Sequence, residues 1–339
     1  MRIQFLTSEK PGTHHTSNKV KTMPNPNTVR RKFLALLALT AGSGFLRRAF
    51  GNTLSQDSTY TEQITEPRIG IALGSGGAKG LAHILMLEVF DELGIKPHLI
   101  VGSSMGAVIG SLYASGLTGK DIRKVIDELV ISKNDRLGTV LFRKDLLKWI
   151  NFLDPNIGSG GLIDGESFIQ HLHQSVRSTR FEELVIPLKV VATDFWRREQ
   201  VVLESGDLLP AIKASMAVPG LFAPVRLNSK VLVDGGTVNP IPYDLLWPEC
   251  DISIAVDVMG TMSTNTQEIP SFFDAIFGGV HILQQSILIQ MMRTRPPDVY
   301  VKPDIMDVRM LEFYKADAIY RQAQGAKDKL KKELERLLA

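Results

Sequence analysis

Two successive segments of this chain repeat one pattern, in which an apolar strand runs into a glycine-rich turn and then into a helix. The first is the apolar run 68–73, which is followed by glycines and by apolar residues at helical spacing over 80–93. The second is the short run 99–101, which is followed by a Gly-x-Ser-x-Gly turn and a helical segment over 105–115. Strands that alternate with helices form a sheet buried between helical layers. The sequence therefore predicts an α/β fold with a partly parallel central sheet and helices on both faces.

The alternation continues less regularly toward the C-terminus. Short apolar runs bounded by turn residues indicate strands, and apolar residues at helical spacing indicate helices. Asn228 and Ser229 mark the turn of a hairpin. The further expected elements are strands at 187–193, 200–204 and 252–258, a hairpin over 225–234, a helix that starts after Thr118, and helices near 167–176, 208–216, 272–292 and 312–338.

Composition and charge exclude several classes of protein. Hydrophobic residues make up 44% and charged residues 22% of the 339 residues, which are ordinary values for a globular chain. No uninterrupted apolar run reaches the ~18 residues of a membrane-spanning helix, and the single cysteine, Cys250, excludes an intrachain disulfide or a cysteine-cluster zinc site. Residues 1–51 carry nine Lys or Arg against one acid, whereas the rest carries 30 basic and 35 acidic residues. A mildly acidic body lacks the basic footprint of nucleic-acid binding, so no nucleic-acid partner is expected.

The N-terminal region differs from the body. Residues 1–27 are polar and lack a hydrophobic period, so we expect a disordered extension there and a linker over 52–67. Residues 28–51 combine paired arginines, an uncharged stretch of 14 residues and small residues, which resembles a twin-arginine export signal. Val29 departs from that signal, a short N-terminal helix is the alternative, and translation from Met23 would shorten the leader. We expect a bacterial protein that is exported to the periplasm or membrane-associated, and a cytoplasmic one if the leader is not processed.

Ser104 lies at the centre of the Gly-x-Ser-x-Gly sequence that Gly102 and Gly106 complete. An apolar strand precedes it and a helix follows it, so the serine sits on a sharp strand-to-helix turn that exposes its hydroxyl. The helix N-terminus also directs backbone amides toward a developing negative charge. This context favours Ser104 as a nucleophile over a plain glycine turn that packs a helix against a strand.

The glycine-rich stretch 74–80 lies between the first strand and its helix. Consecutive glycines allow several backbone N–H groups to converge on an anion. The spacing lacks the Gly-x-x-x-x-Gly-Lys pattern of nucleotide-phosphate loops. In a parallel strand–helix–strand unit this loop emerges at the same edge of the sheet as the Ser104 turn, where an oxyanion hole is needed. Lys79 is interpreted as a charge at the start of the helix rather than as a catalytic acid.

A serine nucleophile needs a proton acceptor, most often a histidine. His281 fits the chain order of ordinary α/β-hydrolases, but it lies in the amphipathic segment 272–292. Asp234, followed by Gly235 and Gly236, comes directly after a strand and is the better candidate, although Asp-Gly pairs are also common turn formers. The residues alone leave open a dyad with Asp234, a Ser–His–Asp esterase or thioesterase that uses His281, and a non-catalytic lipid- or anion-binding module.

Five ordered motifs give the chain a specific resemblance. They are Gly-Gly-x-Lys-Gly at 76–80, Gly-x-Ser-x-Gly at 102–106, Ala-Ser-x-Ala-x-Pro-x-x-Phe-x-Pro at 214–224, Asp-Gly-Gly at 234–236 and Asn-Pro-x-Pro at 239–242. In this order they resemble the patatin-like phospholipase family, over residues 68–258. Ser75 replaces the first glycine of the family's usual triplet, which puts in doubt only the geometry of its own amide.

The resemblance implies a three-layer α/β/α patatin-like fold over 68–258, which we expect to be followed by a C-terminal helical extension over 259–339. It implies a lipid acyl hydrolase of the phospholipase A, lysophospholipase or carboxylesterase type, with Ser104 as nucleophile and Asp234 as general base. The backbone amides implied for the oxyanion hole are those of Gly76, Gly77 and Ala78. The motif-supporting residues that it implies are Lys79, Gly80, Gly102, Gly106, Gly235 and Gly236.

Such a mechanism demands a partly desolvated Asp234 whose pKa is raised above its ordinary value of about 4. Nothing in the body resembles a calcium loop, so we predict that catalysis needs no metal and no cofactor. The expected partner is a phospholipid or another lipid ester. The segment 272–292 is interpreted first as core packing and, as the alternative, as a transient contact with a membrane surface. The sequence leaves the oligomeric state open.

Overall fold

The computed structural model describes residues 67–130, 178–261, 269–270 and 272–339. Residues 64–339 form one compact unit. The predicted N-terminal extension, the export leader, all but the last residue of the linker and the predicted helix near 167–176 lie outside the described residues and stay predictions.

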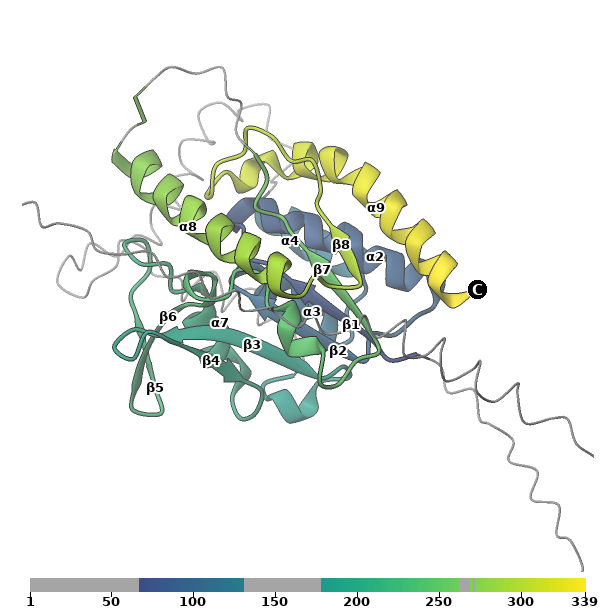
Figure 1. Ribbon diagram of the computed structural model, residues 1–339, viewed down its shortest axis with the longest axis horizontal. Helices are drawn as coiled ribbons and strands as arrows, with labels where there is room; N and C mark the ends of the chain where they lie inside the picture. The colour runs from purple at the N-terminus through teal and green to yellow at the C-terminus, as the bar shows by residue number, and fades with distance from the viewer. Residues whose placement is uncertain (1–66, 131–177, 262–268, 271) are drawn as a thin grey trace, which may run out of the picture. The chain divides into compact units, whose positions relative to one another are not determined.

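The described residues contain an eight-stranded mixed sheet in the order β5-β6-β3-β2-β1-β7-β8, with β4 paired to β3 (Figure 1). The strands are β1 (Ile69–Leu73), β2 (Leu99–Ser103), β3 (Leu188–Asp194), β4 (Glu199–Leu203), β5 (Val225–Leu227), β6 (Lys230–Asp234), β7 (Ile252–Val256) and β8 (Val299–Val301). The pairs β1–β2, β1–β7, β2–β3 and β7–β8 are parallel. The pairs β3–β4, β3–β6 and β5–β6 are antiparallel. The predicted partly parallel sheet is confirmed.

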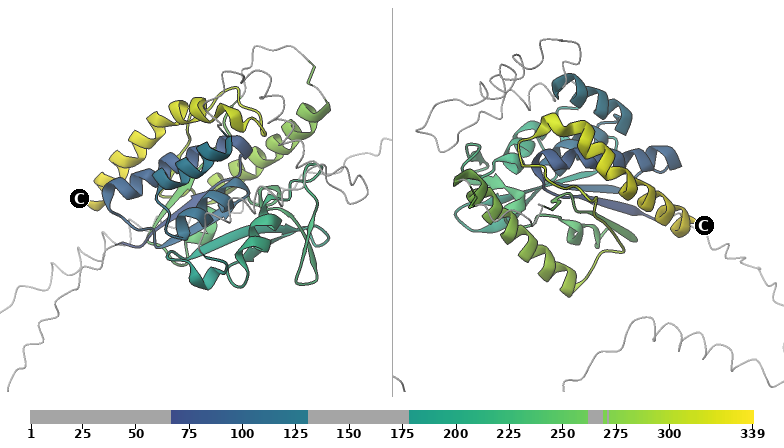
Figure 2. Two further views of the ribbon diagram at one scale, coloured as in Figure 1. Left: turned by 180° about the vertical axis from the view of Figure 1, so that it is seen from behind. Right: turned by 90° about the horizontal axis from the view of Figure 1, so that it is seen from above.

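Helices cover both faces of this sheet, as the two views of Figure 2 show. They are the α-helices α2 (His83–Leu93), α3 (Met105–Ala114), α4 (Gly119–Val130), α7 (Leu208–Met216), α8 (Phe272–Thr294) and α9 (Ala316–Leu338), and the 3-10 segments η1 (Gly77–Ala82), η2 (Phe181–Glu183), η3 (Gly235–Thr237), η4 (Tyr243–Leu246) and η5 (Phe313–Lys315). Side chains alternate along β1: Ile71 joins the core under α2, α3 and α9, whereas Ala72 joins a second core with Tyr243 of η4 and Leu288 of α8. The three-layer α/β/α architecture is therefore confirmed.

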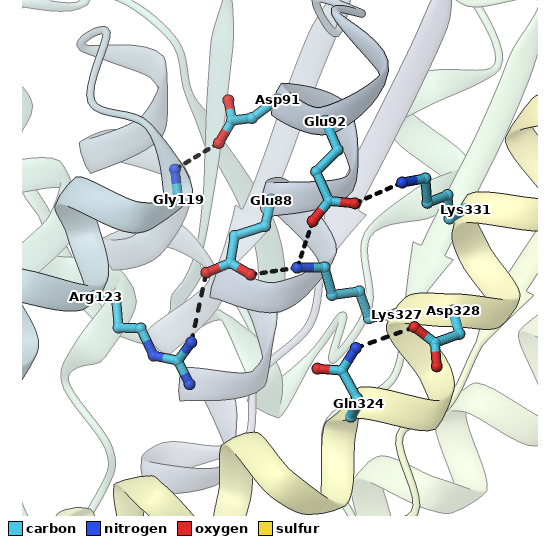
Figure 3. A network of polar contacts seen from close by, with 9 residues as sticks. All are labelled: Glu88, Asp91, Glu92, Gly119, Arg123, Gln324, Lys327, Asp328 and Lys331. Carbon is cyan, nitrogen blue, oxygen red and sulfur yellow. Dashed lines mark hydrogen bonds and ion pairs between the residues drawn. The ribbon is translucent and has the colours of Figure 1, made fainter.

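The C-terminal segment completes this unit instead of extending from it. β8 adds a strand beside β7, and α9 packs along α2 through the ion pairs drawn in Figure 3. The ammonium of Lys327 lies 2.5 Å from a carboxylate oxygen of Glu88 and 2.8 Å from one of Glu92, and Lys331 lies 2.8 Å from the other oxygen of Glu92. The residues beyond 258 thus supply a strand, α8 and α9 to the same layers, and the division into a domain over 68–258 and an extension over 259–339 stays a prediction.

Two helices differ from their predicted form. The predicted helix over 80–93 starts as the 3-10 segment η1 and becomes α-helical only at His83, because it leads out of the glycine loop. The sequence favours core packing of α8, but Gln284 and Leu288 are its only buried side chains among those described. Among the described residues, Ala275–Thr294 is the one helical stretch whose length and apolar composition would suffice to cross a membrane. Within the protein, 11% of its 18-residue apolar segment is buried.

Candidate active site

The register of β3 brings two distant turns together. Ser103 of β2 is paired with Val191 of β3, and Asp234 of β6 is paired with the next residue, Ala192. Ser104 directly follows β2, and Asp234 is the last residue of β6. The two residues therefore leave the sheet at adjacent positions, although they lie far apart in the sequence.

Ser104 occupies the predicted strand-to-helix turn, between β2 and α3. Its backbone has φ 54° and ψ −123°, a conformation that non-glycine residues rarely adopt. The two flanking glycines allow this turn to pack closely. A Cβ at Gly106 would overlap the Leu73 carbonyl oxygen of β1, and one at Gly102 would lie 2.6 Å from the Ala107 backbone nitrogen. The strained backbone is thus held by the sheet and the helix around it, as in a nucleophile elbow.

Ser215 fixes the Ser104 turn from the side of β3. The Ser104 amide donates a hydrogen bond to Oγ of Ser215 over 2.9 Å, and the Ser215 hydroxyl donates to the Val191 carbonyl over 2.6 Å. Ser215 is fully buried at the end of α7. The only signal for this role of Ser215 in the sequence is its place in the motif at 214–224.

We expect Ser215→Ala to cost about 1–3 kcal/mol of folding free energy, because the buried Ser104 amide loses its acceptor. The turn should also become less well positioned, which lowers kcat for ester hydrolysis about tenfold with little change in KM. Urea unfolding and steady-state kinetics measure the two effects. Ser111→Ala is the matched control, because Ser111 is equally buried but its hydroxyl only donates to Val108 within α3. Equal losses of kcat in both variants would contradict a positioning role.

Asp234 is buried and held by its backbone and by one carboxylate oxygen. Its amide donates to the Ala217 carbonyl over 2.9 Å, and its own carbonyl accepts from the hydroxyls of Thr193 and Thr237 over 2.9 and 2.8 Å. Oδ1 accepts from the Gly236 amide over 2.7 Å. Oδ2 is buried and has no hydrogen bond of ordinary geometry among the described residues. One oxygen therefore orients the carboxylate, and the other is left with its acceptor capacity unused.

Burial raises the pKa of Asp234 to about 6, and the Ser104 hydroxyl and the Gly236 amide act in the opposite direction. The Ser104 hydroxyl is thus close enough to stabilise the carboxylate, while Oδ2 still has no hydrogen bond of ordinary geometry. We infer that the contact between the hydroxyl and the carboxylate is long or poorly aligned. A carboxylate with a pKa near 6 is ionised at neutral pH and is a stronger base than an exposed one.

The Asp-Gly-Gly turn is packed against both the glycine loop and α8. A Cβ at Gly235 would overlap the Val191 carbonyl oxygen. A Cβ at Gly236 would lie 2.6 Å from Nε2 of Gln284, 2.7 Å from Oγ of Ser75 and 2.9 Å from Oδ1 of Asp234. Neither position has room for a side chain, which explains the glycine pair. The buried Ser75 hydroxyl has no hydrogen-bond partner among the described residues, so it adds an unused polar group beside Asp234.

The glycine loop presents two of the three expected amides. The Ala78 amide donates to the Met310 carbonyl over 2.7 Å. This corrects the expectation for Ala78, whose N–H is occupied by a backbone acceptor. Gly77 has φ +56° and approaches Met310 so closely that a Cβ would lie 2.5 Å from the same carbonyl oxygen. Within the described part of the chain, no hydrogen bond uses the amides of Gly76 and Gly77, which remain the available donors.

Gly80 and Lys79 occupy the end of this loop. A Cβ at Gly80 would lie 2.6 Å from Cβ of Met105, so glycine lets η1 pack against α3. Burial lowers the pKa of Lys79, an effect that nearby Asp257 opposes.

His281 lies near Lys79 and Asp257. Burial lowers the pKa of His281, the charge of Lys79 lowers it further, and Asp257 opposes both effects. The imidazole Nε2 lies 3.4 Å from Nε2 of Gln285 in the same helix. No hydrogen bond between described residues joins His281 to Ser104 or Asp234. The described residues also contain no group of three or more His, Cys, Asp or Glu arranged to hold a metal ion.

The model of the patatin-like phospholipase family matches residues 71–247, slightly more than half of the chain, and includes both Ser104 and Asp234. The chain belongs to the patatin-like phospholipase family. An uncharacterized NTE family protein of Mycobacterium tuberculosis is 34% identical over 198 residues, which cover 58% of this chain and 51% of that protein. Lysophospholipase NTE1 of Kluyveromyces lactis is 27% identical over 279 residues, which cover 75% of this chain and 18% of that protein.

This patatin-like chain thus spans about half the length of the mycobacterial relatives that it matches. Among solved structures, VipD from Legionella pneumophila is similar with a TM-score of 0.42 and 15% sequence identity. That similarity covers 78% of this chain and 67% of the VipD chain.

Proposed function

We propose that this protein is a serine lipid acyl hydrolase, in which Ser104 attacks a carboxylic ester and Asp234 serves as the general base. One observation carries the proposal: the buried Asp234 carboxylate, with its pKa raised to about 6, lies beside a serine hydroxyl on a strained strand-to-helix turn. Perturbed titratable groups next to a positioned nucleophile are typical of active sites. Membership of the patatin-like phospholipase family supports the same reaction class.

The reaction proceeds in two acyl-transfer steps. As Oγ of Ser104 bonds to the ester carbonyl carbon, Asp234 accepts the hydroxyl proton, and the amides of Gly76 and Gly77 donate to the oxyanion. Collapse of the tetrahedral intermediate breaks the ester C–O bond, and the leaving alcohol takes the proton from Asp234. Water then attacks the acyl-serine with Asp234 again as the base, which releases the carboxylic acid and restores Ser104.

The proposed substrate class is a phospholipid, a lysophospholipid or a related lipid ester. The yeast relative is named a lysophospholipase, and the family model is that of phospholipases. We propose no metal and no cofactor for this reaction, because a base, a nucleophile and two amide donors supply each step.

Covalent labelling tests the proposal directly. A fluorescent fluorophosphonate should label the wild-type protein at one site, and Ser104→Ala should abolish the labelling. His281→Ala should keep the labelling and hydrolyse a soluble p-nitrophenyl butyrate ester within about twofold of the wild-type rate, since no hydrogen bond between described residues joins His281 to Ser104 or Asp234. The proposal is overturned if Ser104→Ala is still labelled, or if folded His281→Ala loses its turnover. A wild-type protein that binds lipid but reacts with neither reagent would be a binding module.

A further inference from the structure

Helix α8 has two unlike faces. Toward the protein, Gln284 and Leu288 are 8% and 6% exposed, and Gln284 packs against Gly236 of the Asp-Gly-Gly turn. On the opposite side, large apolar side chains reach solvent. They are Ile276, Ile282, Leu283 and Ile289, with exposed fractions of 40%, 65%, 65% and 50%. Apolar groups gathered in this way on one helix mark a contact surface. In Figure 1, α8 runs along one side of the sheet.

The outer face mixes apolar and polar groups. At 100° per residue, the exposed residues of α8 fall within one arc of the helix, and Ser286 and Gln290 share that arc with the apolar residues. The segment 275–292 contains no Lys, Arg, Asp or Glu. A helix with one apolar face that is interrupted by small or amide side chains suits the boundary between headgroups and acyl chains.

Cationic groups lie at the C-terminal end of the same helix. Arg293 is exposed in the last turn, and Arg295 follows with its guanidinium carbon 4.2 Å from the centre of the Trp247 ring. Neither arginine has an ion-pair partner among the described residues. Basic groups beside an apolar helix face match a surface that has phosphate groups above hydrocarbon.

α8 also borders both parts of the candidate site. Gln284 contacts the Asp234 turn at Gly236, and His281, one turn earlier, lies near Lys79 of the glycine loop. Ser104 and Asp234 are both buried, so the ester of a membrane lipid must move out of the lipid layer to reach them. A lipid surface against the outer face of α8 would therefore lie one helix diameter from the Asp234 turn.

We propose that α8 docks on a phospholipid bilayer, with the helix axis along the membrane plane and the outer face in the headgroup–acyl boundary. The choice of a lipid surface as the partner rests on the proposed function. An orientation across the bilayer does not fit, because Gln284 and Leu288 hold the helix against the protein and place His281 and Gln285 on inner or flanking positions.

Vesicle co-sedimentation tests the docking surface apart from catalysis. In a Ser104→Ala background, Ile282→Ser/Leu283→Ser should lower the affinity for phosphatidylcholine–phosphatidylglycerol vesicles about tenfold or more. The matched control, Val185→Ser/Leu338→Ser, removes side chains that are 53% and 42% exposed outside α8 and should bind as before. Arg293→Gln should weaken binding to the mixed vesicles about fivefold and leave binding to pure phosphatidylcholine unchanged.

Kinetics with Ser104 present separate the two proposals. The α8 double variant should hydrolyse vesicle phospholipid about tenfold more slowly, while its rate on soluble p-nitrophenyl butyrate stays at the wild-type level and shows that it is folded. Unchanged vesicle affinity in the α8 variant overturns the docking proposal, as does a wild-type protein that binds no vesicles. A dimer that the α8 variant abolishes would assign this face to a second copy and also overturn it. If vesicle binding depends on α8 but no ester is hydrolysed, docking is supported and the proposed function fails.

Discussion

Asp234→Asn is expected to lower kcat for ester hydrolysis by about 10⁴-fold, because the amide cannot accept the proton of Ser104. The substitution keeps the shape of the side chain and an oxygen that accepts from the Gly236 amide, so the turn should stay folded. Steady-state kinetics with a soluble ester measure the loss. Asp194→Asn is the matched control: Asp194 is another buried aspartate, on β3, and its Oδ1 accepts only the amides of the turn that follows, those of Trp196 and Arg197. The control should keep most of the wild-type kcat.

The same substitution should change the pH dependence of activity and of stability. Wild-type kcat/KM should fall about tenfold per pH unit below pH 6, where Asp234 becomes protonated. The folded-state pKa lies above the ordinary value of 3.8. The stability that protonated Asp234 contributes is therefore fully present below about pH 4 and is lost as the pH rises through about 6. Asp234→Asn should be more stable than wild type by roughly 3 kcal/mol at pH 7.5, and the difference should vanish below about pH 3.5. Urea unfolding at the two pH values measures the difference in stability. If the activity of the variant still falls below pH 6, a group other than Asp234 is the base.

The local chemistry of the candidate site could be predicted from the sequence, because each of its turns is determined by a short stretch of chain. A strand, a serine between two glycines and a helix define the Ser104 turn without reference to the rest of the molecule. The same is true of the hairpin turn, where Asn228 and Ser229 have φ values of 47° and 63°. Helix α7 occupies residues 208–216 as predicted, because its apolar spacing is that of an ordinary helix.

Contacts between distant segments could not be predicted in this way. The three-residue strand β8 has too few residues for a period, and only its parallel pairing with β7 defines it. The Ala78 amide is free or occupied according to the position of Met310, which comes from another part of the fold. The bond between the Ser104 amide and Ser215 likewise depends on how α7 packs against β3. Among the described side chains of α8, the second core takes up only Leu288, Met291 and Met292, and a pattern along the helix alone does not reveal this limited packing.

Gly106→Ala is expected to destabilise the protein by about 3 kcal/mol or more, because the new methyl group would overlap backbone atoms of neighbouring residues. Its Cβ would overlap the Leu73 carbonyl, and the next nearest heavy atoms also belong to the backbone of Leu73 and Gly74. The overlap could be removed only if β1 moved away from α3. Such a movement is resisted because β1 is hydrogen-bonded on both edges, to β2 and to β7. Backbone in the middle of a sheet cannot yield as the end of a flexible side chain can. Urea unfolding measures the loss of stability.

Gly325→Ala shows whether the cost of Gly106→Ala comes from this close approach or from replacing any helical glycine. Gly325 lies in α9, and a Cβ there would meet nothing within 4 Å. Alanine should therefore stabilise α9 by about 0.5–1 kcal/mol through its higher helix propensity. The two substitutions add the same methyl group to a helix, so opposite signs of the change in unfolding free energy would isolate the contact with Leu73. A Gly106→Ala protein as stable as wild type would mean that the Ser104 turn is looser than these distances require, and the strained φ of Ser104 could then relax without substrate.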